Sequence, residues 1–215
     1  MSNIKLVHSG GNSVSLTTPT SNPSSNVTFK LPGADGTANQ TLITDGSGAL
    51  SFATPSSSMV DVWRLSTPLT INSTSGNHIV ISANWERPDT AGQTNINGGM
   101  SIDSSTGYWT FPSTGIYKVE FNLMGYSSSA TPYIDVQTLY RTSAGGSFTT
   151  ISRILACIGV VGGYCSGHMY NVLNVDNISD DALLFRARSG STGGAIRGNS
   201  GRNETHVVFT KLGDI

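Results

Sequence analysis

The sequence predicts an all-β protein, with an N-terminal β-ribbon stem of short strands and a C-terminal antiparallel jelly-roll sandwich. Three observations predict this fold class. Short runs of alternating apolar and polar residues recur along the 215-residue chain, and turn residues separate them. No segment of about ten or more residues combines a helical apolar period with helix caps, so helices should be rare.

The clearest strand follows a turn in the segment WTFPSTGIYKVEF, residues 109–121. Pro112 fixes φ and Gly115 permits a positive φ, so we predict a tight turn between them. Polar and apolar residues then alternate, and this period of two places Tyr117 and Phe121 on one face. A half-buried strand is expected there.

The composition divides the chain into two parts. Residues 1–58 contain only short apolar groups separated by Gly, Asn, Pro and Ser, which predicts stem strands too short to enclose a core. Residues 54–58 are typical of a linker, so residues 59–215 are expected to form the head. Stem strands are predicted at Ile4–Val7, Val14–Leu16, Val27–Leu31 and Thr41–Ile43. Head strands are predicted at Val60–Leu65, Ile79–Trp85, Tyr108–Phe111, Ile116–Met124, Tyr133–Arg141, Ser147–Cys157, His168–Val175, Ala182–Arg188 and Thr205–Leu212.

The charge of the chain argues against two classes of partner. Only 12% of the residues are charged and the formal net charge is −1, so no global field attracts nucleic acid. No apolar run approaches the roughly 18 residues that span a bilayer. The N-terminal residues also lack the pattern of a secretion signal. We therefore expect no nucleic-acid binding and no membrane insertion.

Chemically active patterns are not found. The acidic residues are dispersed and the Gly-Gly pairs lack the Lys-Ser/Thr of a phosphate loop, so we predict no enzyme activity, no cofactor and no metal site.

Cys157 and Cys165 are expected as reduced residues in strands, with a disulfide bridge across a hairpin as the alternative. The three tryptophans are expected in the core or an interface, with an exposed sugar-stacking platform as the alternative. They are Trp63, Trp85 and Trp109.

The Gly-Ile-Tyr strand resembles the Phe-x-x-x-Gly-x-Tyr-x-Val-x-Phe signature of the trimeric jelly rolls typified by the globular head of the first complement component and by tumour necrosis factor. The closing segment Thr205–Leu212 is similar to the final strand of that family. In the family, three subunits pack aromatic-rich faces around a threefold axis. The resemblance therefore implies a homotrimer with Tyr117, Phe121 and Phe209 at the subunit interface.

The stem segment FKLPGADGTANQTLITDGSGALSF, residues 29–52, resembles a segment that recurs in the stems of tailed-bacteriophage fibres and other virion appendages. It departs in having Asn39 where Gly is usual, and Asn tolerates the left-handed conformation better than most residues. The resemblance implies a stem that anchors the chain to a major capsid or tail protein. The expected anchor residues are apolar and precede residue 32: Ile4, Leu6, Val14, Leu16, Val27, Phe29 and Leu31.

These resemblances imply a structural protein of the bacteriophage virion surface, assembled in the host cytoplasm. Capsid decoration protein, head fibre and tail fibre or receptor-binding tip remain as alternatives, and so does a lectin-like or cytokine-like secreted ligand. Arg188, Arg197 and Arg202 are expected as rim or inter-subunit contacts, with contact to a host cell-surface receptor such as a glycan as the alternative.

Overall fold

A computed structural model describes residues 4–16, 19–53, 59–71, 77–129 and 131–215. The chain forms two compact units, Met1–Ser56 and Ser57–Ile215. Every regular element in the described ranges is a β-strand, and neighbouring strands of each sheet run antiparallel. The all-β prediction is confirmed. The described part of the chain contains no helix long and apolar enough to cross a membrane.

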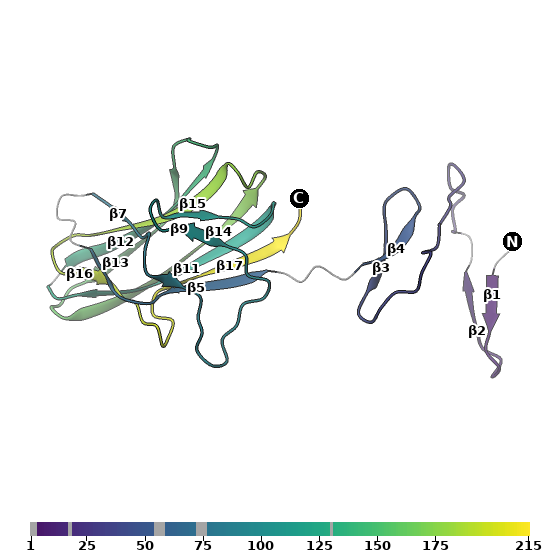
Figure 1. Cartoon of the computed structure of the whole chain (residues 1–215), viewed down its shortest axis with the longest axis horizontal. Helices are drawn as coiled ribbons and strands as arrows, with labels where there is room; N and C mark the ends of the chain where they lie inside the picture. The colour runs from purple at the N-terminus through teal and green to yellow at the C-terminus, as the bar shows by residue number, and fades with distance from the viewer. Residues whose placement is uncertain (1–3, 17–18, 54–58, 72–76, 130) are drawn as a thin grey trace. The chain divides into compact units, whose positions relative to one another are not determined.

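The N-terminal unit, here called the stem, contains two separate strand pairs (Figure 1). Strand β1 (Ile4–Val7) pairs with β2 (Ser13–Leu16), and β3 (Thr41–Thr44) pairs with β4 (Leu50–Ala53). An isolated two-stranded hairpin is marginally stable in water at best. The stem therefore depends on contacts beyond its own two hairpins.

Local polar groups shape the hairpin β3–β4. The carboxylate Oδ1 of Asp45 accepts hydrogen bonds from the backbone N–H groups of Ser47 at 2.8 Å and Ala49 at 3.0 Å, which closes the turn. Asn39 has φ of 67°, so the expectation that asparagine adopts the left-handed conformation at this position is confirmed. The local chemistry of the sequence thus determines this hairpin.

The strand predicted at Val27–Leu31 is wrong. Within this segment only Lys30 takes part in a bridge, a parallel one with Ala49. A strand needs a neighbour along its length, and the described stem provides none for these residues beyond that single bridge.

The C-terminal unit, here called the head, is built on eight principal strands. They are β5 (Val60–Leu65), β10 (Tyr108–Thr110), β11 (Gly115–Ser127), β12 (Thr131–Thr142), β13 (Thr149–Ile158), β14 (Gly163–Val175), β15 (Asp181–Ser189) and β17 (His206–Gly213). The first pairs with the last, the second with the seventh, the third with the sixth and the fourth with the fifth. This nested pairing is that of a jelly roll.

The eight strands form two sheets (Figure 1). One has the order β5–β17–β11–β14 and the other the order β10–β15–β12–β13. Short strands extend their margins: β6 (Leu69–Ile71), β7 (Ile79–Val80), β8 (Trp85–Glu86), β9 (Ser101–Asp103) and β16 (Gly194–Ile196).

The strand predicted at Ile79–Trp85 is divided into β7 and β8, and Asn84 between them has φ of 65°. Strands β6, β9 and β16 were not expected, because three residues are too few to show a period.

The turn before β11 forms as the sequence predicts. Gly115 has φ of 144°, a region that side-chain-bearing residues rarely adopt. A Cβ atom at this position would also lie only 2.6 Å from the carbonyl oxygen of Gly213. Glycine therefore allows β11 to start beside the end of β17.

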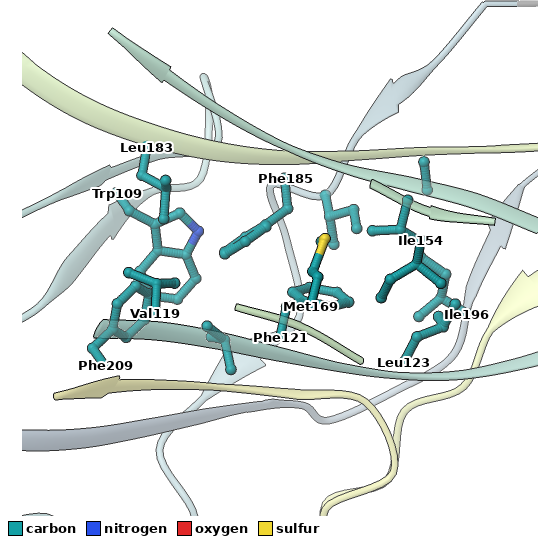
Figure 2. Close-up of a cluster of buried hydrophobic side chains, with 14 of the residues drawn as sticks. Trp109, Val119, Phe121, Leu123, Ile154, Met169, Leu183, Phe185, Ile196 and Phe209 are labelled. Atoms are coloured by element: carbon teal, nitrogen blue, oxygen red, sulfur yellow. The ribbon is translucent and has the colours of Figure 1, made fainter. Parts of the chain in front are cut away.

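Aromatic rings from the two sheets interlock in the core of the head (Figure 2). The ring centroids of Phe121 and Phe185 lie 4.7 Å apart, and those of Trp109 and Phe209 lie 5.0 Å apart. Each pair joins one residue from the β11–β17 sheet to one from the β10–β15 sheet. Close aromatic contacts of this kind add to the stabilisation from buried apolar area.

The assignment of Tyr117, Phe121 and Phe209 to a subunit interface is wrong. All three side chains are buried within a single head, with relative exposures of 0%, 1% and 0%. The Tyr117 hydroxyl is also used internally, since it donates a hydrogen bond of 2.9 Å to the Ser113 carbonyl. The period of two identified their common face, but not whether the opposite sheet or another subunit covers it.

The exposed sugar-stacking platform is likewise contradicted. Trp109 is fully buried, and Trp63 and Trp85 pack edge-on against it with centroid distances of 5.3 and 5.4 Å. The tryptophans belong to the core of the head, as the sequence favoured.

Replacing Phe121 by alanine should lower the free energy of unfolding by about 3–5 kcal/mol, because the truncated side chain leaves a cavity between the sheets. Denaturant unfolding of the full chain measures this loss. Val161→Ala, at a loop position where the side chain is exposed, is the matched control and should change stability little. Equal unfolding midpoints for wild type and Phe121→Ala would contradict the packing described.

Candidate functional site

The outer side of strands β11 and β14 carries an exposed aromatic surface, here called the tyrosine face. It is formed by Tyr126, Tyr164, Tyr170 and Val172, with Lys118, Glu120 and His168 among them. Tyr164, Tyr170 and Val172 are 58%, 62% and 59% exposed. Three large side chains this exposed on one strand form an apolar patch of the kind found at protein interfaces.

The register of the two strands organises this face. Tyr126 lies opposite Tyr164 and their ring centroids are 5.0 Å apart. Glu120 lies opposite Tyr170, forms an ion pair of 2.9 Å with Lys118 and stands 3.8 Å from His168 Nε2. The face thus combines apolar area with one acidic and one basic group, a composition that a second copy of itself can complement.

Strand β14 also forms an edge. Among the described strands its backbone ladder pairs only with β11, while the Tyr140 hydroxyl of β12 donates to the Asn174 carbonyl at 3.0 Å and Asn171 donates to Ser152 of β13 at 2.9 Å. Unpaired backbone groups at a sheet edge are a common site of association. The tyrosine face therefore continues to an edge that a neighbouring molecule can reach.

The expected anchor residues of the stem lie on its surface. The side chains of Ile4, Leu6, Leu16, Val27, Phe29 and Leu31 are all more than 60% exposed, and Leu31 reaches 78%. The side chain of Val14 lies outside the described residues. Large apolar residues at this density cannot be buried by the stem hairpins alone. They form a second candidate interaction surface.

Arg188 belongs to a charged cluster on the outer side of the β10–β15–β12–β13 sheet. The buried carboxylate of Asp135 receives hydrogen bonds from Arg153 at 2.7 and 2.8 Å and from Arg188 at 2.8 Å. His78 Nε2 lies 3.1 Å from the same carboxylate. Because charge-assisted hydrogen bonds are strong when partly shielded from water, this cluster holds three strands in register.

Arg197 and Arg202 are engaged elsewhere. Their guanidinium groups lie 3.3 and 2.7 Å from the carboxylate of Glu204, which is almost fully buried. The structure therefore does not bring the three sequence-selected arginines to one acidic partner. Instead it brings Arg188 together with Arg153, which sequence reasoning missed because their proximity depends on pairing across β12.

Proton binding by Asp135 is opposed by its arginines. Burial by itself raises the pKa of the Asp135 carboxyl, but hydrogen bonds from Arg153, Arg188 and His78 outweigh burial and hold the pKa below its ordinary value. Burial also lowers the pKa of His78, against the opposing effect of its hydrogen bond to Asp135. The lowered pKa favours the neutral form of His78 at pH 7.

Other reactive residues show no comparable convergence. Cys157 and Cys165 are both free thiols, and burial raises the pKa of Cys165. His168 lies inside β14 and not at its start, because that strand begins at Gly163. Within the described ranges, no group of three or more His, Cys, Asp or Glu residues is arranged to hold a metal ion.

No protein-family profile and no curated protein sequence matches this chain. Solved structures similar to it include murine APRIL at pH 8.0, at 14% identity and a TM-score of 0.49 over 73% of this chain and 100% of that chain. The TNF Eiger from S. frugiperda is similar at 14% identity and a TM-score of 0.49, over 74% of this chain and 94% of that chain. We infer neither ligand nor partner from similarity at this level.

Asp135→Asn should lower the free energy of unfolding at pH 7 by about 3 kcal/mol, because it leaves the converging arginines without their carboxylate. The pKa of Asp135 is lower in the folded than in the unfolded chain, so its stabilisation is present above about pH 4 and is lost as pH falls through the folded pKa.

Urea unfolding at pH 7 and at pH 3 measures both effects. The difference between wild type and Asp135→Asn should shrink at pH 3, whereas Asp35→Asn, at an exposed stem position, should match wild type at both pH values. A difference that is the same at both pH values would contradict the role assigned to the carboxylate.

Proposed function

We propose that this chain is a structural protein of the bacteriophage virion: a homotrimeric surface appendage whose stem binds a major capsid or tail protein and whose head projects outward. The single observation that carries the proposal is the stem. Its residues 29–52 resemble virion appendage stems in sequence, and its apolar residues are exposed where an anchor requires them. The head would reinforce the particle, adhere weakly to a host surface, or do both.

Exposure of the stem supports docking. Burying a Leu, Ile, Val or Phe side chain stabilises a complex by about 1.5–3 kcal/mol, and the described part of the stem exposes seven such residues before residue 32. Strand addition to a partner sheet would also satisfy the outer edges of β1 and β2, which pair only with each other in the described stem. A capsid or tail protein is thus the expected occupant of this surface.

The tyrosine face supports self-association of the head. We propose a second copy of the chain as the partner of this face. Lys118 of one copy can pair with Glu120 of the next, and Tyr170 and Val172 are then buried between the copies. The proposed subunit interface is therefore the outer side of β11 and β14, in place of the buried residues Tyr117, Phe121 and Phe209. Trimerisation would also multiply weak contacts between the head and a host surface.

The length of the stem favours a position close to the capsid. A stem of 56 residues that turns back on itself in two hairpins spans far less than a fully extended chain. A capsid decoration protein or head fibre fits such a short stem best. A tail fibre tip is the second candidate, since the same resemblance in residues 29–52 applies to tail fibres.

Tyr170→Asp should convert the trimer to monomers, because it places a carboxylate beside Glu120 in an apolar interface. Sedimentation velocity of the purified chain at micromolar concentration measures the change. The control Ile178→Asp alters an exposed side chain in the loop after β14 and should leave the trimer intact. A wild-type chain that sediments as a folded monomer would defeat the trimer outright.

Deleting residues 1–31 should abolish incorporation into particles while the head still trimerises, because the deletion removes the exposed apolar residues of the anchor. Immunoblotting of purified particles, produced with the deleted chain in place of wild type, measures incorporation. Replacing Leu6 and Leu16 by Asp should have the same effect, whereas Lys5→Asp, on the same strand as Leu6, should not. Normal incorporation of the deleted chain would contradict the anchor and place it after residue 31.

A further inference from the structure

We propose that Arg153, Arg186 and Arg188, here called the arginine array, form a binding site for the carboxylate group of an acidic glycan on the outer side of the β10–β15–β12–β13 sheet. This inference deepens the proposed function, since it rests on the adhesive role proposed for the head. It names both the site and the chemical class of its ligand.

The array is assembled by cross-strand register. Gln137 on β12 lies directly opposite Arg153 on β13 and Arg186 on β15. Arg188 lies opposite Asp135, two residues before Gln137 on the same face. Three guanidinium groups, from β13 and β15, thus flank the amide of Gln137 and the carboxylate of Asp135 on β12.

The number of cations exceeds what the buried carboxylate requires. Elsewhere in the head, the fully buried Asp61 is neutralised by one arginine, Arg87, through bonds of 2.9 and 2.8 Å. At Asp135, two arginines bind the carboxylate and a third stands beside it. Counting these three guanidinium groups and the one carboxylate, positive charges exceed negative charges by two on this face. Neighbouring like charges repel one another, so a ligand that carries negative charge would be stabilised on this face.

Arg186 is the member whose charge the cluster leaves uncompensated. Its Nε and Nη2 atoms donate to the amide oxygen of Gln137 at 3.0 and 2.8 Å, and Nη2 also lies 3.4 Å from Thr150 Oγ1. Both acceptors are neutral. They orient the guanidinium group without neutralising it, as a preorganised binding group requires.

The support beneath the array is buried and rigid. Asp135 is 0% exposed and Gln137 is 7% exposed, and both lie on the central strand β12. They hold the guanidinium groups in place, while the side chain of Arg153 remains 44% exposed to solvent. Asp135 and Gln137 accept from the Nε and Nη2 atoms of Arg153 and Arg186, so a ligand carboxylate would meet the Nη1 side of these guanidinium groups.

The surroundings favour a sugar acid over a nucleic-acid strand. Leu155 and Val80, which lie opposite Asp135 and Arg186, are exposed apolar side chains that can contact the apolar face of a sugar ring. The chain as a whole has a net charge of −1 and the array is confined to one patch. A long polyanion would need an extended basic track, whereas a single carboxylate on a glycan needs only such a patch.

The test uses the full chain and polygalacturonate, a polymer of carboxylated sugars, in isothermal titration calorimetry at low and physiological salt. Wild type should bind it, and Arg186→Gln should weaken binding at least about tenfold, because charged hydrogen bonds to the carboxylate are lost. Arg186→Lys keeps the charge but loses the paired hydrogen bonds to Gln137 that orient it, and its binding should fall between the two. Lys30→Gln, which removes an exposed cation from the stem, should bind as wild type does.

Three comparisons decide the chemistry. Methyl-esterified polygalacturonate should bind at least about tenfold more weakly, because esterification removes the charge that the array recognises. Equal binding of ester and acid, or of wild type and Arg186→Gln, would overturn the site. Binding of polyglutamate as tight as that of polygalacturonate would overturn the assignment to a glycan in favour of an acidic peptide.

Incorporation separates this inference from the proposed function. Arg186→Gln should enter particles as wild type does, since the array lies in the head. A chain that binds polygalacturonate through Arg186 but is absent from particles would sustain the site and refute the virion role. A chain that enters particles but shows no binding would refute the site alone.

Discussion

The strict alternation of side chains along β11 is the constraint on which the rest of the head depends. All thirteen residues of this strand alternate between buried and half-buried positions. One face supplies Phe121 to the core and the other supplies Glu120 to the tyrosine face, so a shift of one residue would exchange core and surface. Because β11 pairs with β14, β16 and β17, its register also fixes theirs.

Buried aspartates set a second constraint at the margins of the core. Asp61 ties β5 to the loop before β9 through Arg87 and the backbone N–H of Met100, and Asp135 ties β12 to its two neighbours. An ion pair in a buried position is costly to break, so such pairs specify arrangement more than they add net stability. More arginines surround Asp135 than are needed to neutralise its carboxylate. This excess of positive charge is the basis for the proposed glycan site.

Stem and head handle apolar surface in opposite ways. The head buries its large aromatic residues between two sheets, whereas the stem exposes residues such as Phe29 and Leu31. The difference follows from architecture, since two isolated hairpins have no opposite layer to cover them. The head thus has a core of its own, whereas the proposed function has the stem complete its packing on a partner. That division is consistent with an appendage.

The sequence by itself determined the elements whose signals are local. The turn between Pro112 and Gly115, the left-handed conformation of Asn39 and the principal strands of the head follow from backbone preferences and a period of two. Only the tertiary structure decided what covers each face. Phe121 meets Phe185 of the opposite sheet, and Arg153 meets Arg188 across β12, because strands distant in sequence pair there. The alternation of apolar and polar residues shows which residues share one side of a strand. Which side chains pack against that side depends on how distant strands pair in the whole fold.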